Sequence, residues 1–141
     1  MNLTESQKTA LDHATQAEAA ANRQDYQQAS ELYAQAASTE GLDTPLQWQY
    51  RNQQALMLAE FGREFRNNTA LEDAIKLYET TVLELAPQDE RPDDWATTQH
   101  LLGNALGLLG QRQRATIMLE RAIRVFENLL LTRTREQARL E

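Results

Sequence analysis

The chain has 141 residues, enough for one domain, and Ala, Leu and Gln together supply 56 of them, whereas Gly supplies 5 and Pro 3. Strong helix formers dominate, so this composition disfavours a β-rich fold. The absence of Cys excludes disulfides, thiolate metal sites and cysteine nucleophiles. The net charge of −7 argues against nucleic acid as a partner, because phosphate binding needs an excess of Lys and Arg.

Membrane and export signals are absent from the sequence. No apolar run approaches the roughly 20 residues that span a bilayer. Residues 1–5 lack the basic segment and apolar run of a signal peptide. We therefore expect a cytoplasmic protein that does not bind a membrane.

The first two helices are predicted from their start signals and the apolar spacing that follows. Thr4 and Gln7 have the spacing of a capping box, which predicts a helix from about residue 4 to 22. Asp25 then precedes apolar residues at helical spacing and is a suitable cap for a second helix, which should end near residue 38.

Two further capping boxes predict the third and fourth helices. Thr44 with Gln47 starts the third, which should reach about residue 64. Thr69 with Glu72 starts the fourth. Together with the first two, these helices predict antiparallel neighbours joined by short connections.

Pro87 ends the fourth helix, and the polar stretch after it reads as a loop. The aspartates at 93 and 94 can cap the fifth helix, and Gly110 is placed to stop it. A sixth helix is predicted to begin near residues 112–114. The result is six helices in three antiparallel pairs.

The second half of the chain repeats itself. Residues 62–83 align with residues 110–131 at a constant offset of 48, so that Leu71 and Ile75 fall on Leu119 and Ile123. Trp48 and Trp95 are 47 residues apart, as are the prolines at 45 and 92. Such a repeat predicts stacked helix pairs, each of which buries its apolar face against its neighbours. The recurring tryptophans favour a packing role between repeats.

The order and spacing of these residues resemble the tetratricopeptide repeat. Its pattern has Leu-Gly and a bulky residue in the first helix, Gly at the turn, and Ala, a bulky residue and Ala in the second. The matching positions are Ala17, Ala20, Tyr26, Ala29, Tyr33 and Ala36 in the first pair; Leu58, Gly62, Tyr78 and Pro87 in the middle pair; and Leu102, Gly103, Leu106, Gly110, Ala115, Leu119 and Ala122 in the last pair.

The resemblance covers about residues 8–131, and the last two pairs also look like a bacterial variant with repeats of about 48 residues. It implies an all-α fold of three stacked antiparallel helix pairs, forming a short right-handed α-solenoid. The pairs are expected at residues 4–38, 44–86 and 93–139, within a single domain over residues 1–141.

No constellation in the sequence supports catalysis. His13 and His100 have no partner histidine at the spacing of four that a helical zinc site uses. No Ser lies in a Gly-x-Ser-x-Gly turn, and there is no Gly-rich phosphate loop. We therefore expect a protein that is not an enzyme and that has no metal and no cofactor.

The resemblance implies that the first helix of each pair lines a concave groove. Side-chain amides there can donate to and accept from the backbone of an extended peptide. The family's Lys and Arg clamp for a C-terminal carboxylate is not reproduced; only Asn104 resembles it. The leading hypothesis is a scaffold that binds a protein or peptide in this groove; the alternative is a polar wall without a ligand. The candidate contact residues are Glu18, Gln49, Asn52, Thr97, His100 and Asn104.

The last predicted helix is apolar over roughly 160° of its circumference, whereas the end of a repeat array should be polar. Either the tail from Thr132 folds back, or a partner covers this face, or the chain belongs to a longer array. Charge is also uneven, at −5 for residues 1–44, −3 for 45–92 and +1 for 93–141. The alternative function is therefore self-assembly as a homodimer through Met118, Ile123, Phe126 and Leu130.

Overall fold

The computed structural model describes residues 2–114 and 116–140, and within them the chain forms helices and no strand. The predicted all-α class is confirmed. α4, η1 and α5 follow one another without a break and together form one long helical segment. The elements are α1 (Glu5–Asn22), α2 (Tyr26–Ala37), α3 (Thr44–Glu64), α4 (Asn68–Leu77), the π-helical turn η1 (Tyr78–Val82), α5 (Leu83–Leu85), α6 (Pro92–Gln113) and α7 (Thr116–Leu140).

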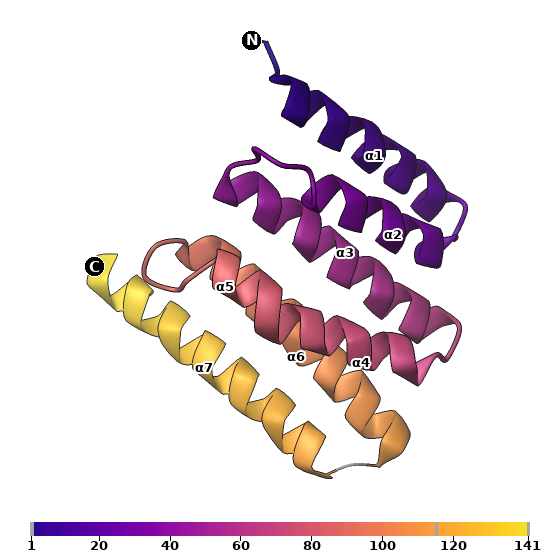
Figure 1. Cartoon of the computed structure of the whole chain (residues 1–141). Coiled ribbons are helices and arrows are strands. Elements are labelled where there is room, and N and C mark those ends of the chain that lie inside the picture. The colour runs from indigo at the N-terminus through magenta and orange to yellow at the C-terminus, as the bar shows by residue number, and fades with distance from the viewer. Residues whose placement is uncertain (1, 115, 141) are drawn as a thin grey trace.

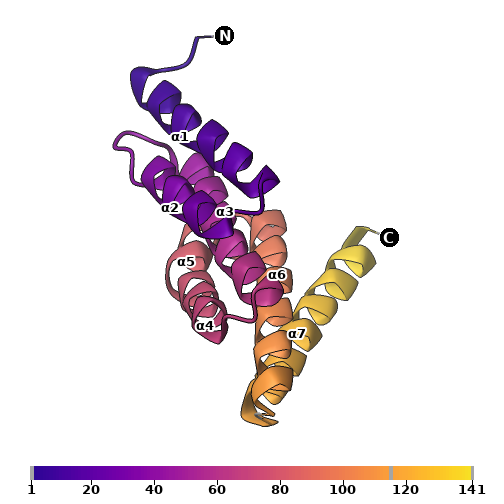
Figure 2. The same ribbon diagram turned by 90° about the vertical axis from the view of Figure 1, so that its right-hand side faces the viewer.

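Consecutive helices lie side by side and run in opposite directions, so that the molecule progresses from α1 to α7 in chain order (Figure 1). α2 packs against both α1 and α3, and α4 packs against both α3 and α6. α7 crosses α6, and its C-terminal half diverges from it (Figure 2). This helical order follows from local contacts, because each helix covers an apolar face of the one before it.

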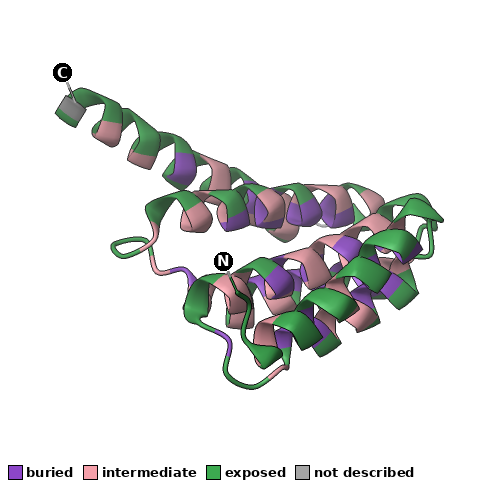
Figure 3. Ribbon diagram, turned by 90° about the horizontal axis from the view of Figure 1, so that it is seen from above, coloured by how far each residue is buried: buried purple, intermediate pink, exposed green. Residues whose placement is uncertain are grey.

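The C-terminal part of α7 extends beyond the other helices and is mostly exposed (Figure 3). Residues 132–140 continue α7 and do not turn back over it. Of the three alternatives for the apolar face of this helix, a tail that folds back from Thr132 is therefore wrong. The good helix formers of this segment simply extend α7 into solvent.

Two of the predicted helix caps are confirmed. The Thr4 hydroxyl accepts from the backbone N–H of Gln7 at 3.0 Å, and the Gln7 side chain accepts in return from the Thr4 N–H at 2.9 Å. The Asp25 carboxylate accepts from the backbone N–H of Gln28 at 3.2 Å. In both cases a side-chain oxygen satisfies an N–H that the first helical turn leaves free.

The caps predicted for α3 and α4 are wrong. Asp43 caps α3, and Asn67 caps α4; each accepts a backbone N–H three residues later at 3.0 Å. Thr44 and Thr69 lie inside the helices. Asp and Asn are stronger caps than Thr, so the better acceptor a residue or two upstream starts the helix.

The predicted ends of α6 are also wrong. α6 begins at Pro92, so the aspartates at 93 and 94 lie in its first turn and do not cap it. Gly110 lies inside the helix, which ends at Gln113; the C-cap residue Arg114 has the left-handed conformation, with φ 51°. Gly110 is needed where α6 meets α7, because an added Cβ would lie 2.9 Å from Leu119 Cδ2. Ala115 lies outside the described residues.

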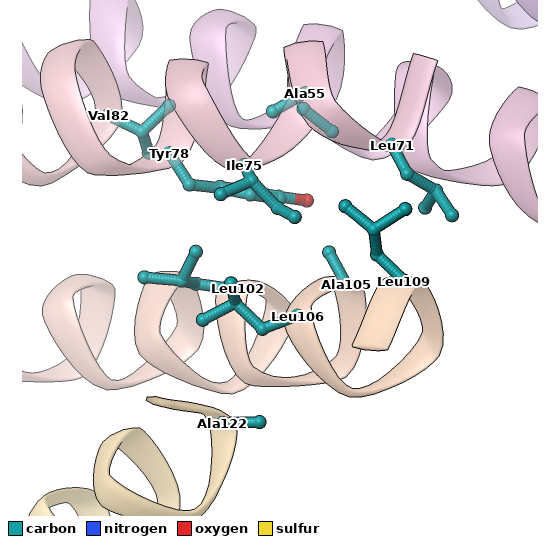
Figure 4. Close-up of a cluster of buried hydrophobic side chains, with 11 residues drawn as sticks. Ala55, Leu71, Ile75, Tyr78, Val82, Leu102, Ala105, Leu106, Leu109 and Ala122 are labelled. Carbon is teal, nitrogen blue, oxygen red and sulfur yellow. The ribbon is translucent and has the colours of Figure 1, made fainter. Parts of the chain in front are cut away.

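The largest hydrophobic core lies between α4 and α6, with contributions from α3 and α7 (Figure 4). Trp48 packs against it and donates from Nε1 to Thr98 Oγ1 at 3.0 Å, while the Arg91 guanidinium lies 5.7 Å from its ring centroid. Smaller, Ala-rich clusters join α1, α2 and α3. The core residues are Ala55, Leu71, Ala74, Ile75, Tyr78, Val82, Leu102, Ala105, Leu106, Leu109 and Ala122.

Candidate functional site

One face of α3 is bordered by two hollows. Gln49, Gln53, Leu56, Glu60 and Arg63 follow one another at spacings of four and three, so they share one side of the helix. The first two line one hollow, and the last three line the other. Arg63 lies 14 positions after Gln49, which corresponds to about 21 Å along the helix. We call the two hollows and this face together the α3 groove.

The first hollow is polar and lies between α1, α2 and α3, with a volume of about 420 Å³. Glu18 is exposed there and makes no ion pair within the described residues. Burial, and then the charge of Glu18, raises the pKa of the Tyr33 hydroxyl. The hollow is therefore rich in hydrogen-bonding groups and negative. Its lining residues are Leu11, Ala14, Thr15, Glu18, Tyr33, Gln49, Tyr50 and Gln53.

The second hollow is largely apolar and lies between α3, the α4–η1 segment and α6, with a volume of about 390 Å³. Glu60 and Arg63 form an ion pair on α3 at this hollow. A mainly apolar hollow with a few polar groups is typical of a site for a side chain or small ligand. The lining residues are Leu56, Ala59, Glu60, Arg63, Leu71, Tyr78, Leu101, Asn104, Ala105 and Leu108.

Tyr78 is one of the residues that border the second hollow, and its hydroxyl is buried out of reach of solvent. The residue is fully buried, and its Oη has no hydrogen-bond partner among the described residues. In Figure 4 the ring lies between α4 and α6, and the hydroxyl points toward the end of the cluster that contains Leu71. Burial, followed by the negative charge of Glu60, raises the pKa of Tyr78, so the hydroxyl stays protonated.

The backbone at Tyr78 is also unusual. The N–H of Leu83 donates to the Tyr78 carbonyl five residues earlier, which defines a π turn. Such turns are rare and are frequent at functional sites. The turn keeps both Tyr78 and Val82 fully buried against α6.

The structure brings three of the six predicted groove residues to these hollows. Glu18 and Gln49 line the polar hollow, and Asn104 lines the apolar one. Asn52 is buried, with 8% of its surface exposed and no hydrogen-bond partner for Oδ1 within the described part of the chain.

Thr97 and His100 lie on the side of α6 that approaches α7. Thr97 lines a separate hollow of about 230 Å³ between these two helices, together with Leu129. The His100 ring is edge-on to Phe126, with 6.1 Å between the ring centroids. Neither residue lines the two hollows of the α3 groove.

Sequence reasoning missed Gln53, Glu60, Arg63 and Tyr78 as site residues. The first three follow from the spacing of four and three that begins at Gln49, which was a usable signal. Tyr78 comes from the second helix of its pair, which the resemblance assigns to the other side of the array. Only the packing of α4 against α6 reveals that this residue borders the hollow.

The candidate self-association face on α7 is uneven in exposure. Ile123 and Leu130 are 54% and 68% exposed, whereas Met118 and Phe126 are half-buried. Phe126 packs over Gly103 of α6, where an added Cβ would lie 2.6 Å from its ring. The outer part of the predicted face is therefore open to solvent.

Neither a metal centre nor a membrane helix is found among residues 2–114 and 116–140. No three His, Asp or Glu side chains gather there as a metal site would require. The described helices are also too short or too polar to cross a bilayer. Comparison with known proteins gives no family profile, curated protein or solved structure that matches this chain.

Proposed function

We propose that the chain is a non-catalytic scaffold of the tetratricopeptide type, a short right-handed solenoid whose α3 groove binds an extended segment of another protein. The observation that carries the proposal is the alignment of two unlike hollows on one face of α3. A helix face bordered by hollows offers rigid pockets, so binding needs little ordering of the scaffold.

The groove defines the chemistry of the segment. Its length of about 21 Å accommodates roughly six residues of extended chain. The amides of Gln49 and Gln53 can pair with the backbone of that chain, because each amide both donates and accepts. The unpaired Glu18 carboxylate favours a Lys or Arg at one end, and the apolar hollow favours a large nonpolar side chain at the other.

The proposal is tested by selecting binders from a library of displayed random 12-residue peptides and measuring their affinity by calorimetry. We expect the selected peptides to contain a basic residue about six positions or fewer from a large apolar one. Glu18→Lys should weaken binding by roughly fivefold or more, because the substitution replaces attraction with repulsion.

Glu31→Lys is the matched control. Glu31 is exposed on α2 and lines neither hollow, yet the substitution changes the net charge by the same amount. It should leave the affinity within about twofold of wild type, since distant surface charges are screened by salt. Selection of no peptide, or an equal loss of affinity in both variants, contradicts groove binding.

A second candidate function, self-assembly as a homodimer, is favoured by the internal repeat. Ile75 and Val82 of the α4–η1 segment are covered by α6 and at most 5% exposed. Their counterparts 48 residues later, Ile123 and Leu130, are exposed on α7. A stripe that is buried in one repeat and open in the next is suited to contact with a copy of itself about a twofold axis.

Light scattering during size exclusion tests this second function. A homodimer has twice the chain mass of 16.1 kDa, and Ile123→Glu with Leu130→Glu should return it to the monomer mass. Asn128→Glu introduces one negative charge, the same as either single substitution, at an exposed position on another side of α7 and should leave the dimer intact. A wild-type monomer at high concentration rules out this function.

A further inference from the structure

The polar hollow of the α3 groove contains hydrogen-bonding groups that are open to a ligand. The Glu18 carboxylate is exposed and makes no ion pair within the described residues. Tyr33 is half-buried; no hydrogen bond contributes to the pKa of its hydroxyl, and its oxygen is not one of the unpartnered side-chain atoms that are closed to solvent. Gln49 and Gln53 add their side-chain amides to the same hollow. A ligand there meets one carboxylate and several neutral acceptors.

These groups come from three helices and surround the hollow. Glu18 belongs to α1, Tyr33 to α2, and Gln49 and Gln53 to α3. Tyr33 also packs against both of the Ala-rich clusters that join these helices, so its ring is held in place. The charge of Glu18 acts on the Tyr33 hydroxyl, which places the two groups near each other. The hollow is thus suited to a cationic group whose donors point in several directions.

We propose that the polar hollow binds an arginine side chain of the segment held in the groove, in preference to a lysine. The inference rests on the proposed function, which calls for a basic residue at this end of the groove and does not choose between the two. A guanidinium has five N–H donors in a planar fork, so it can pair with the Glu18 carboxylate and a neutral acceptor such as Tyr33 Oη at the same time. An ammonium group is a compact charge with three donors and is more strongly hydrated.

The size and the charge of the hollow agree with this ligand. A volume of about 420 Å³ lies in the range of pockets that enclose a side chain or small ligand. None of its lining residues is basic, so no charge there repels a cation. Because burial and Glu18 raise the pKa of Tyr33, this hydroxyl is neutral at physiological pH and accepts through its lone pairs.

The experiment compares two probes of equal charge on the full chain, Nα-acetylarginine methylamide and Nα-acetyllysine methylamide. Binding is followed by the chemical shifts of the side-chain NH₂ groups of Gln49 and Gln53, which line the hollow. We expect wild type to bind the arginine probe roughly fivefold more tightly than the lysine probe, the value of one additional hydrogen bond.

Tyr33→Phe removes one neutral acceptor and keeps the ring, so the preference for arginine should fall below about twofold. Glu18→Gln removes the charge and should weaken both probes by roughly threefold or more. Tyr26→Phe is the matched control, because Tyr26 also belongs to α2 but does not line this hollow; it should leave both affinities unchanged.

The inference is overturned if neither probe shifts the two glutamine amides, if wild type binds both probes equally, or if Tyr33→Phe keeps the full preference. These failures differ from those of groove binding. If selected peptides respond to Glu18→Lys but carry lysine as often as arginine, groove binding stands and the arginine preference is wrong. If the arginine probe is preferred through Tyr33 but no peptide is selected, the chemistry of the hollow stands and peptide binding is wrong.

Discussion

Gly62 of α3 lies so close to Leu71 of α4 that no side chain fits between them. A Cβ on Gly62 would be 2.6 Å from Leu71 Cγ and 2.9 Å from the Asn67 carbonyl oxygen. The counterparts 48 residues later, Gly110 and Leu119, make the same contact at 2.9 Å. In both helix pairs, the two helices therefore meet through the same glycine–leucine contact, which gives the sequence repeat a physical basis.

Gly62→Ala should destabilise the protein by about 2 kcal/mol or more, because the added methyl group meets backbone as well as the branched carbon of Leu71. Gly107→Ala is the control: it lies in α6, and nothing is within 4 Å of its Cβ position. That variant should gain about 0.5–1 kcal/mol from helix propensity alone. Denaturant unfolding measures both, and a Gly62→Ala protein as stable as wild type would refute the close contact.

Much of the fold could be predicted from the sequence because it depends on local signals. Helical spacing and caps such as Thr4 and Asp25 act within a few residues, and the structure agrees with them. The errors at Asp43 and Asn67 arose where two capping residues stood close together, and a motif alone does not rank them. Gly110 was misread because its contact is tertiary.

The candidate site was less predictable, since helix rotation decides which residues reach it. The resemblance, applied to the spacing of the first helices, places Glu18, Gln49 and Asn104 in the groove, and these three line the two hollows. Asn52 shares this spacing but is buried by the packing of its neighbours. No local pattern shows that Tyr78 borders the groove, because its position depends on how α4 and α6 meet.

Arg112 joins α6 to the end of α3. Its guanidinium donates to the carbonyl oxygens of Gly62 at 2.5 Å and Arg63 at 2.7 Å, which lie in the last turn of α3. A cation there offsets the partial negative charge at the C-terminal end of α3, where the Gly62 carbonyl also accepts the Asn67 backbone N–H at 3.1 Å. Arg112→Ala should cost about 1–3 kcal/mol in the free energy of unfolding.

Arg112→Lys separates charge from geometry. Lysine keeps the charge but lacks the planar fork that reaches two carbonyls at once, so it should restore only part of the loss. Arg124→Ala removes an exposed arginine of α7 and should change stability by less than about 0.5 kcal/mol. Equal stability of the Arg112→Ala and Arg124→Ala variants would show that the hydrogen bonds of Arg112 to α3 contribute nothing to the free energy of unfolding.

The Trp48–Thr98 hydrogen bond connects two helix pairs. Thr98 is fully buried, accepts from Trp48 Nε1 at 3.0 Å and donates to the Asp94 carbonyl at 3.0 Å. Thr98→Val keeps the shape but leaves the indole N–H unpaired, so it should cost about 1–3 kcal/mol. Thr98→Ser keeps the hydroxyl and should retain the hydrogen bond.

A double-mutant cycle with Trp48→Phe isolates this bond, because Phe removes the N–H. The coupling energy between positions 48 and 98 should be about 0.5–1.5 kcal/mol. Strictly additive effects would mean that the two side chains merely pack together.

The raised pKa of the Tyr78 hydroxyl predicts that the protein loses stability at alkaline pH. Its pKa is raised in the folded state, first by burial and then by Glu60, whereas in the unfolded chain it ionises near pH 10. The contribution of the neutral hydroxyl is therefore complete below about pH 10 and is lost as the pH rises above that value, by about 1.4 kcal/mol per pH unit. Denaturant unfolding between pH 8 and about 11.5 should show a shallower decline for Tyr78→Phe than for wild type. Tyr26→Phe is the control: it removes a hydroxyl bonded to Glu64 near the surface and should change the decline much less. Equal slopes for wild type and Tyr78→Phe would mean that the Tyr78 hydroxyl ionises as readily in the folded chain as in the unfolded one.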